Sequence, residues 1–185
     1  MAVAYKAPVK DIVFGYEVID SYNVLNKIAA FSDFSEDVVV PTMEECAKFS
    51  EEVLAPINAI GDQQGATIND GVVTMPEEFV DAYKKFSDAG WASISLPEEI
   101  GGGGMPITLS GGTLEILSTA NLAFGLAPGL SAGAISAINF HGSQEQKDKF
   151  LPKLVSGEWT GTMNLSEPQS GSDLGTITTK AEAQE

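Results

Sequence analysis

The spacing of apolar residues predicts helices in the first third of the chain. Residues 5–30 mix apolar and polar positions without a strong break, which predicts one or two short helices forming an appendage. Beyond Pro41, apolar residues recur every three or four positions as far as Ile60, a spacing typical of an amphipathic helix. Because proline suits the first turn of a helix and disturbs its interior, we expect this helix to begin at Pro41 and to kink at Pro56.

A hairpin and another helix are predicted next. The sequence Asn-Asp-Gly at 69–71 lies between two short apolar runs, which is a signal for a tight turn between two strands. Pro76 then begins a helix that Gly90 ends. One face of this helix carries four residues with apolar surface: Phe79, Ala82, Tyr83 and Phe86.

Four consecutive glycines, residues 101–104, lie in a loop between Leu96 and Pro106. Glycine has no Cβ, so it allows backbone angles and close approaches that other residues block. A flexible connection is the ordinary interpretation of such a loop, and a phosphate-binding loop is the alternative.

Residues 116–140 contain no charged side chain. The run is long enough for a membrane span, but Asn121, Pro128 and several glycines interrupt it, so we expect two buried helices and no membrane span. Small residues recur at intervals of four, which places them on one helical face where either another helix or a thin apolar ligand can come close. These residues are Gly125, Gly129, Gly133 and Ala137.

The end of this uncharged run and the start of the next helix are marked clearly. We expect His141-Gly142 to end one helix, and Ser143 with Gln146 to form a capping box for the next, which should end near Pro152. His141 is the only histidine, and at a helix end it is better explained by its position than by catalysis. With no cluster of histidine and cysteine, the sequence predicts no metal site.

From residue 156 onward the pattern changes from helical to alternating. Residues 159–165 and 177–181 are short alternating stretches that predict strands of a second, β-type domain. Residues 166–175 join them and concentrate hydroxyl groups and glycines.

This joining segment should form a fixed turn. Pro168 restricts Glu167 to an extended backbone, while Gly171 and Gly175 permit tight reversals. Such a turn can present hydroxyl and N–H donors to an anionic or carbonyl-rich ligand. An ordinary hydrogen-bonded turn is the alternative.

Charge and cysteine content narrow the function classes. The chain has 26 acidic and 10 basic residues, a net charge of -16, so it repels nucleic acid and anionic membranes. All basic residues are lysines, so any bound phosphate must be held without arginine. Cys46 is the only cysteine and fits a buried apolar position in a reducing compartment. Residues 1–11 lack the apolar stretch of a signal peptide, which predicts a cytoplasmic protein.

Three groups of motifs follow one another in the chain. They are Pro97-Glu98 with glycines 101–104, Gly142-Ser143-Gln144-Glu145 with Leu151-Pro152-Lys153-Leu154, and Leu165-Ser166-Glu167-Pro168 with Gly171-Ser172-Asp173. In this order they resemble the acyl-CoA dehydrogenase family from Thr42 to the last residue. Residues 1–35 resemble the N-terminal extension of a longer branch of that family. The resemblance implies a mainly α chain: the family's N-terminal helical domain at 36–155, then the first strands of its middle β-domain at 156–185.

The resemblance also implies an FAD site. The residues it assigns to the flavin are Met163, Leu165, Ser166, Gly171 and Ser172. Ser172 corresponds to the place where the FAD pyrophosphate meets the pantetheine arm of the acyl-CoA substrate. Glu167 corresponds to a glutamate that shapes the turn, so no catalytic residue is expected here. In the family the base comes from the C-terminal part.

The activity implied is oxidation of an acyl-CoA thioester to the trans-2-enoyl-CoA, with a carboxylate removing the α-proton and the β-hydride passing to flavin N5. The longer branch commonly acts on fatty acyl-CoA or related acyl-CoA thioesters, so the resemblance implies a role in fatty acid metabolism such as β-oxidation. The implied partners are an electron-transfer flavoprotein and further copies of the full-length chain. Two alternatives stay open: an acyl-CoA oxidase of the same fold, and a non-catalytic subunit or binding module that keeps the flavin-side motif.

Overall fold

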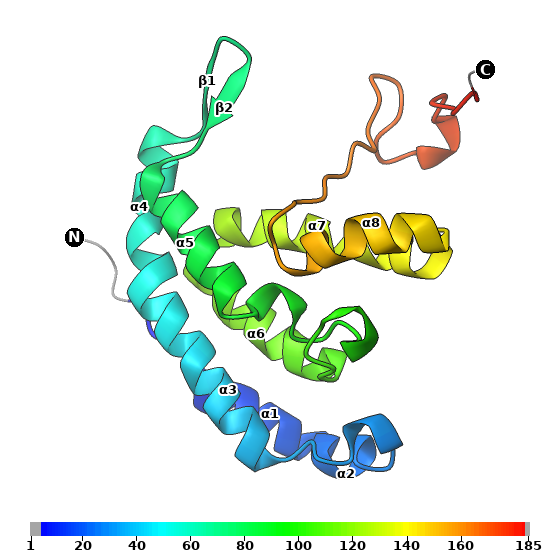
Figure 1. The fold of residues 1–185 in the computed structure, drawn as a ribbon. Coiled ribbons are helices and arrows are strands. Elements are labelled where there is room, and N and C mark those ends of the chain that lie inside the picture. Colours follow the sequence, from blue (N-terminus) through cyan, green and yellow to red (C-terminus); the bar gives the residue numbers. More distant parts are fainter. Residues whose placement is uncertain (1–4, 184–185) are drawn as a thin grey trace.

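The computed structural model describes residues 5–183, and most of these residues are helical (Figure 1). The helices are α1 Val9–Val18, α2 Ser21–Leu25, α3 Glu36–Phe49, α4 Ala55–Gln64, α5 Glu77–Asp88, α6 Ile107–Ala120, α7 Leu122–His141 and α8 Gln144–Val155. A π turn, Ser50–Leu54, joins α3 to α4. Single 3₁₀ turns lie at Ala29–Phe31, Trp91–Ser93, Glu98–Ile100 and Leu174–Thr176. The mainly helical fold class is confirmed.

The main hydrophobic core lies among α1, α3, α4, α5 and α6. Its centre consists of side chains with no exposed surface: Val39, Met43, Cys46, Leu54, Leu109 and Ile116. A smaller cluster lies where α7 packs on α8, and contains Ile135, Leu151, Leu154 and Val155. The fold therefore has one large core and a second, smaller helix pair beside it.

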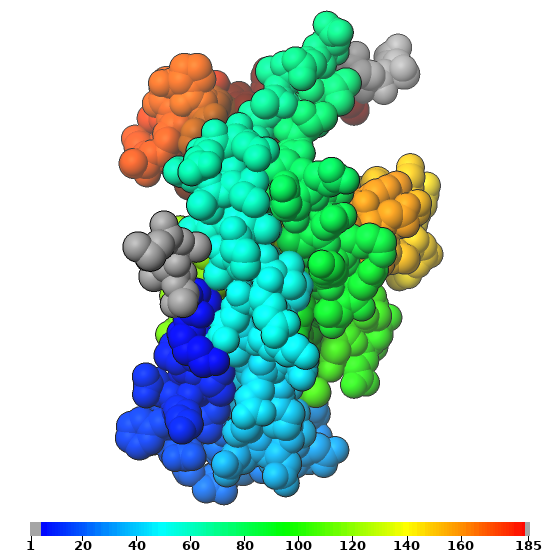
Figure 2. All heavy atoms as spheres, turned by 90° about the vertical axis from the view of Figure 1, so that its left-hand side faces the viewer, coloured from blue at the N-terminus to red at the C-terminus, as the bar shows by residue number. Residues whose placement is uncertain are grey.

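The N-terminal segment belongs to the main core, so the prediction of an appendage is wrong. α1 packs along α3, and Figure 2 shows this blue segment lying against the cyan helix. Val13 and Tyr16 are buried there, and the Tyr16 hydroxyl donates to the Thr108 carbonyl at 2.8 Å. Gly112 on α6 leaves the space that the Tyr16 hydroxyl fills. The weak apolar pattern of residues 5–30 concealed this packing because only one narrow face of α1 is buried.

The long helix of the core begins earlier than predicted. α3 starts at Glu36 after the extended residue Ser35, and Glu36 and Asp37 favour the positive end of the helix. Pro41 is therefore inside the helix and not in its first turn. Its missing N–H leaves the carbonyl of Asp37, an exposed residue, without its helical donor. The predicted disturbance at Pro56 takes the form of the π turn that precedes it.

The hairpin and the helix after it are confirmed. β1 Thr67–Asn69 pairs antiparallel with β2 Val72–Thr74. Asp70 and Gly71 both have positive φ, 50° and 78°, as a two-residue hairpin turn requires. α5 begins after Pro76 and buries Phe79, Ala82 and Phe86, with Tyr83 half-buried. Gly90, at a φ of 75°, follows its end.

The glycine-rich loop folds back on its own beginning. The N–H groups of residues 102–105 donate to the carbonyls of Pro97, Ser93, Leu96 and Ile94. A Cβ on Gly103 would lie 2.7 Å from the Ile94 carbonyl oxygen, and one on Gly102 would overlap the Leu96 carbonyl. The glycines thus allow a close backbone approach. Because these N–H groups already have partners, the loop does not offer them to a phosphate.

The uncharged run forms two helices as predicted, but only the first is largely buried. α6 buries six residues, whereas α7, although longer, buries only Phe124, Ser131 and Ile135. By length and composition α7 also satisfies the requirements of a membrane span, and it is the one helix in residues 5–183 that does so. The expectation of two buried helices is therefore wrong for α7.

The last helix is confirmed with a later end. Both hydrogen bonds of the capping box between Ser143 and Gln146 are present, and α7 ends at His141. α8 continues past Pro152 to Val155 because Leu154 and Val155 are buried against α7.

Beyond Val155 the described chain contains no strand, so the strands predicted at 159–165 and 177–181 are not formed in residues 156–183. A strand requires a neighbouring strand for its N–H and C=O groups, and no such partner lies beside these residues in the described chain.

Candidate functional site

The segment 166–175 is a fixed turn, as predicted. Glu167 and Ser170 exchange backbone hydrogen bonds of 2.7 and 3.0 Å. The Ser170 hydroxyl donates to the Asp173 carbonyl at 2.8 Å, and Ser170 is only 2% exposed. The Asp173 carboxylate accepts from the Gly175 N–H at 3.0 Å. The turn therefore keeps its shape through hydrogen bonds among its own residues.

Glu167 ties this turn to the chain eleven and twelve residues later. Its carboxylate accepts the N–H of Thr178 at 3.0 Å, the Thr178 hydroxyl at 2.8 Å and the Thr179 N–H at 2.8 Å. The Thr179 hydroxyl and the Gln169 side-chain amide donate to it as well. These donors, led by the Thr179 hydroxyl, lower the pKa of Glu167 to about 2. A general base needs free lone pairs and a pKa near the working pH, so Glu167 shapes the turn and does not act as a base.

Thr178 and Thr179 are site residues that sequence reasoning missed. They belong to a short run, residues 177–181, whose alternation predicts a strand. No local rule connects them with a carboxylate eleven residues earlier. Only the fold of the turn brings the two hydroxyl groups to Glu167.

The five predicted flavin residues all lie on exposed surface of this segment. Met163 and Leu165, 63% and 41% exposed, lie in the stretch that leads into the turn. Ser166 lies next to Gly171, since a Cβ on Gly171 would be 3.8 Å from the Ser166 hydroxyl. Ser172 follows on the exposed side of the same turn. The structure thus brings Ser166, Gly171 and Ser172 together.

Hydrogen-bond donors on this side of the turn are free within the described residues. The hydroxyls of Ser166 and Ser172 donate to no acceptor in residues 5–183, and neither do the N–H groups of residues 171 and 172. The nearby carboxylates of Glu167 and Asp173 already accept hydrogen bonds. The turn can therefore offer donors to phosphate or carbonyl oxygens without any arginine.

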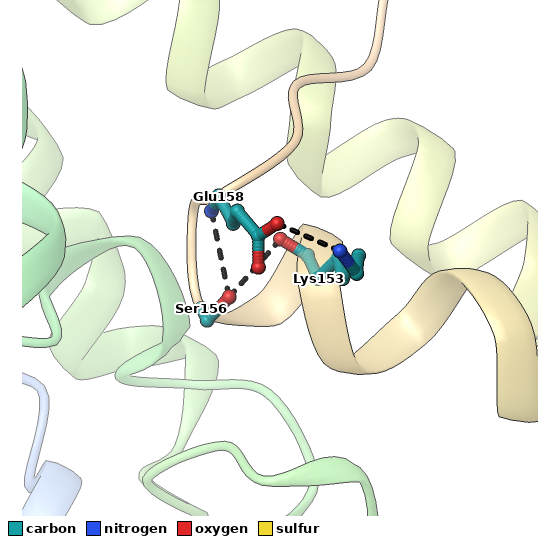
Figure 3. Close-up of polar contacts among 3 residues, drawn as sticks. All are labelled: Lys153, Ser156 and Glu158. Atoms are coloured by element: carbon teal, nitrogen blue, oxygen red, sulfur yellow. Dashed lines mark hydrogen bonds and ion pairs between the residues drawn. The ribbon is translucent and has the colours of Figure 1, made fainter.

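The chain leaves α8 along a defined path toward this turn. Figure 3 shows the Lys153 ammonium paired with the Glu158 carboxylate at 2.7 Å, and the Ser156 hydroxyl donating to the Lys153 carbonyl at 3.2 Å. The Glu158 N–H donates back to the Ser156 hydroxyl at 3.4 Å. Trp159 lies on the Phe150 ring with centroids 6.1 Å apart. These contacts give the exit from α8 a fixed direction.

The glycine ladder of α7 faces open space. A Cβ on Gly129 or Gly133 would meet no atom within 4 Å, and one on Gly125 would lie 3.5 Å from the Ser118 hydroxyl. Within residues 5–183 no helix packs on Gly129 or Gly133, so the helix-packing alternative has no partner in the described chain. Large apolar side chains share the exposed surface of the helix: Leu122, Leu126, Leu130 and Phe140. An apolar ligand or a covering protein surface fits this face.

Other chemically reactive groups lie away from the turn. Cys46 is fully buried, its thiol points to the Thr113 carbonyl, and burial raises its pKa to about 12. His141 is exposed in the last turn of α7. Within residues 5–183, no three His, Cys, Asp or Glu side chains lie close enough to hold a metal ion. A groove of about 710 Å³ lies between α3 and the segment that includes the start of α1, and it carries charges of both signs, with Lys6 paired to Glu51.

Known proteins share both the helical body and the site segment. Residues 41–158 match the family described as acyl-CoA dehydrogenase, N-terminal domain. The chain is 41% identical over 175 residues to a 3-methylmercaptopropionyl-CoA dehydrogenase of Ruegeria pomeroyi, covering 95% of this chain and 30% of that protein. It is 33% identical over 180 residues to a butyryl-CoA dehydrogenase of Syntrophomonas wolfei, covering 95% of this chain and 29% of that protein.

A solved structure has a similar arrangement. An acyl-CoA dehydrogenase from Bacillus anthracis complexed with FAD superposes with a TM-score of 0.63 and 26% identity, over 79% of this chain and 23% of that chain. The family match ends at residue 158, before the turn, whereas the alignments to the two relatives cover 95% of the chain. The chain spans about 30% of the length of those two relatives.

Proposed function

Because the chain belongs to the acyl-CoA dehydrogenase family, we propose that it is the N-terminal part of an FAD-dependent enzyme that oxidises an acyl-CoA thioester to the trans-2-enoyl-CoA. The observation that carries this proposal is the turn at 166–175. It keeps its shape internally and leaves the donors of Ser166 and Ser172 free on one exposed side.

The residues of the turn suit FAD. A pyrophosphate and the carbonyl-rich edge of a flavin ring both accept hydrogen bonds, and the turn supplies hydroxyl and N–H donors for them. Met163 and Leu165 add apolar surface next to these donors. In this proposal Met163, Leu165, Ser166, Gly171 and Ser172 hold the cofactor, and Ser172 also binds the acyl-CoA arm. FAD, when bound, supplies the acceptor for the β-hydride.

The base is assigned to another part of the enzyme. The α-proton of a thioester is weakly acidic, so its removal requires a carboxylate and hydrogen bonds to the thioester carbonyl. Glu167 does not suit this role, since donors occupy its carboxylate and its pKa is about 2. We assign the base to the C-terminal part of the full-length protein, and binding and orientation of the flavin to residues 163–172.

The substrate class and partners follow from the same family assignment. The names of the two relatives, for 3-methylmercaptopropionyl and butyryl groups, favour a short acyl chain. The exposed apolar face of α7, with its glycine ladder, suits the acyl group. We propose that the full-length protein passes its electrons to an electron-transfer flavoprotein and forms a homo-oligomer. We also propose that it is cytoplasmic and takes part in fatty acid oxidation. An acyl-CoA oxidase is the alternative for the electron acceptor.

A direct test uses the full-length protein. Its visible spectrum should show bound flavin, and short acyl-CoA thioesters should reduce a dye in its presence. Residues 1–185 expressed alone should hold FAD weakly and reduce no dye. A full-length protein without flavin or without acyl-CoA-dependent reduction contradicts the proposal. Stopped-flow reoxidation by oxygen and by an electron-transfer flavoprotein separates the oxidase from the dehydrogenase.

A further inference from the structure

The chain from residue 156 to residue 161 touches three helices in turn. Gly157 has a φ of 76° and lies against Ser87 on α5, whose hydroxyl a Cβ would overlap. The Trp159 N–H donates to the Lys153 carbonyl on α8 at 2.9 Å, and the Lys153 ammonium lies 4.7 Å from the Trp159 ring centre. The first two contacts thus fix the path away from α8.

The third contact joins Gly161 to α7. Ser131, only 6% exposed, accepts the Gly161 N–H at 3.0 Å and donates to the Ala127 carbonyl at 3.1 Å. A Cβ on Gly161 would lie 2.5 Å from the Ala134 Cβ and 3.2 Å from the Ser131 Cα. The φ of Gly161 lies outside the left-handed region, so other residues can adopt its backbone. Position 161 therefore requires glycine because α7 lies too close for a side chain, and not because of the backbone conformation.

After Gly161 the hydrogen bonds of the described chain stay within the segment itself. Those of residues 162–183 join the turn to itself and Glu167 to Thr178 and Thr179. Figures 1 and 2 show this orange and red segment projecting from the helical body. The Ser131–Gly161 contact is thus the last hydrogen bond in residues 5–183 by which the helices direct the chain toward Met163.

We infer that Gly161 and Ser131 are positioning residues for the flavin segment, an inference that rests on the proposed function. Ser131 is on the buried face of α7, and the exposed glycines 129 and 133 are on the opposite face. One rigid helix therefore carries both the candidate acyl surface and the contact that aims residues 163–166. A site on a helix can be held within the small tolerance that a reaction between two bound groups requires. The Ser131–Gly161 contact sets the placement of the flavin segment relative to that helix.

The test is Gly161→Val in the full-length, flavin-loaded protein. The added side chain must push the segment away from Ala134, so the rate of flavin reduction in stopped flow should fall about a hundredfold, as for a displacement of roughly 1 Å. The KM for acyl-CoA and the melting temperature should stay close to those of the wild type. Gly111→Val is the matched control, because Gly111 is an exposed helical glycine whose Cβ would meet no atom within 4 Å.

Ser131→Ala gives a second, milder variant that removes the acceptor and adds no volume. It should lower the reduction rate in the same direction, and it decides the question if Gly161→Val does not fold. Amide exchange of residues 159–166 in the flavin-free protein should be faster in both variants. Amide exchange does not depend on FAD, so it tests the Ser131–Gly161 contact even if the wild type binds no flavin. Absence of flavin in the wild type would contradict the proposed function alone. Unchanged reduction rates in folded, flavin-loaded variants overturn the positioning role, whatever the exchange shows.

Discussion

The helical body, residues 5–155, and the C-terminal segment, residues 156–183, each keep their shape through different interactions. In the body, side chains such as Met43 and Leu109 have no exposed surface. Burying one such side chain contributes about 1.5–3 kcal/mol. In the segment only Gly157 and Ser170 are buried, and the shape comes from hydrogen bonds around Glu167.

This difference separates stability from function. Hydrogen bonds in exposed segments contribute roughly 0.5–1.5 kcal/mol each, so the segment adds little to the free energy of unfolding of the body. Yet it carries all five candidate flavin residues. Substitutions in the body should therefore change stability first, and substitutions in the segment should change binding and turnover while the body stays folded.

The largest effect is expected in the core of the body. Leu109→Ala should lower the free energy of unfolding by about 2–5 kcal/mol, because it leaves a cavity in the core cluster that also contains Met43 and Cys46. Leu114→Ala, on the same helix but 53% exposed, should change it by less than about 0.5 kcal/mol. Urea unfolding followed by far-UV circular dichroism measures both. Equal losses from the two variants would show that α6 is not packed as described.

A smaller loss, in binding and not in folding, is expected at Ser172. Ser172→Leu in the full-length protein removes a hydroxyl donor and blocks the backbone, so FAD and acyl-CoA should both bind more weakly. Loss of one hydrogen bond to a charged group costs about 1.5–3 kcal/mol. Flavin content after gel filtration and the KM for acyl-CoA report the two losses. Wild-type values for both would remove Ser172 from the site.

The glycine ladder distinguishes a ligand surface from a structural one. Gly129→Leu should leave the protein folded and raise the free energy of unfolding by no more than about 1 kcal/mol, because leucine favours a helix more than glycine does and the new side chain meets open space in the described chain. If α7 binds the acyl group, the variant should prefer shorter acyl chains than the wild type does. A series of acyl-CoA thioesters assayed with the flavin-loaded full-length protein gives the answer. Equal losses with every chain length would assign the face to packing against another part of the protein.

The smallest effect concerns the charge of Glu167. Its pKa of about 2 lies below the ordinary value near 4.3, so its stabilisation of the turn is complete above about pH 4.3 and disappears as the pH falls through about 2. The NMR shifts of the Thr178 and Thr179 amides should therefore stay constant from pH 7 to pH 5 and move only in strong acid. Glu167→Gln should remove this acid transition. A transition centred near pH 4.3 would mean that the carboxylate is not held by these donors.

The sequence by itself determined the local elements whose signals are local. Asn69, Asp70 and Gly71 specify the hairpin because two successive positive φ values need such residues. Ser143 and Gln146 specify the start of α8 because the capping box closes within four residues. The motif around Glu167 predicted the turn because Pro168 and the hydroxyl residues act on their neighbours in the chain. The same motif, together with the two motifs before it, also indicated the family.

Only the tertiary structure decided which surfaces meet. The N-terminal segment became part of the core through contacts between residues far apart in sequence, such as the hydrogen bond from the Tyr16 hydroxyl to the Thr108 carbonyl. Burial of Val155 against α7 carried α8 past Pro152. The contact of Gly161 with Ser131 spans thirty residues and has no sequence signal, because a glycine required by a neighbouring helix looks the same as a glycine in any loop. Packing, unlike capping or turn chemistry, depends on which faces the whole chain brings together.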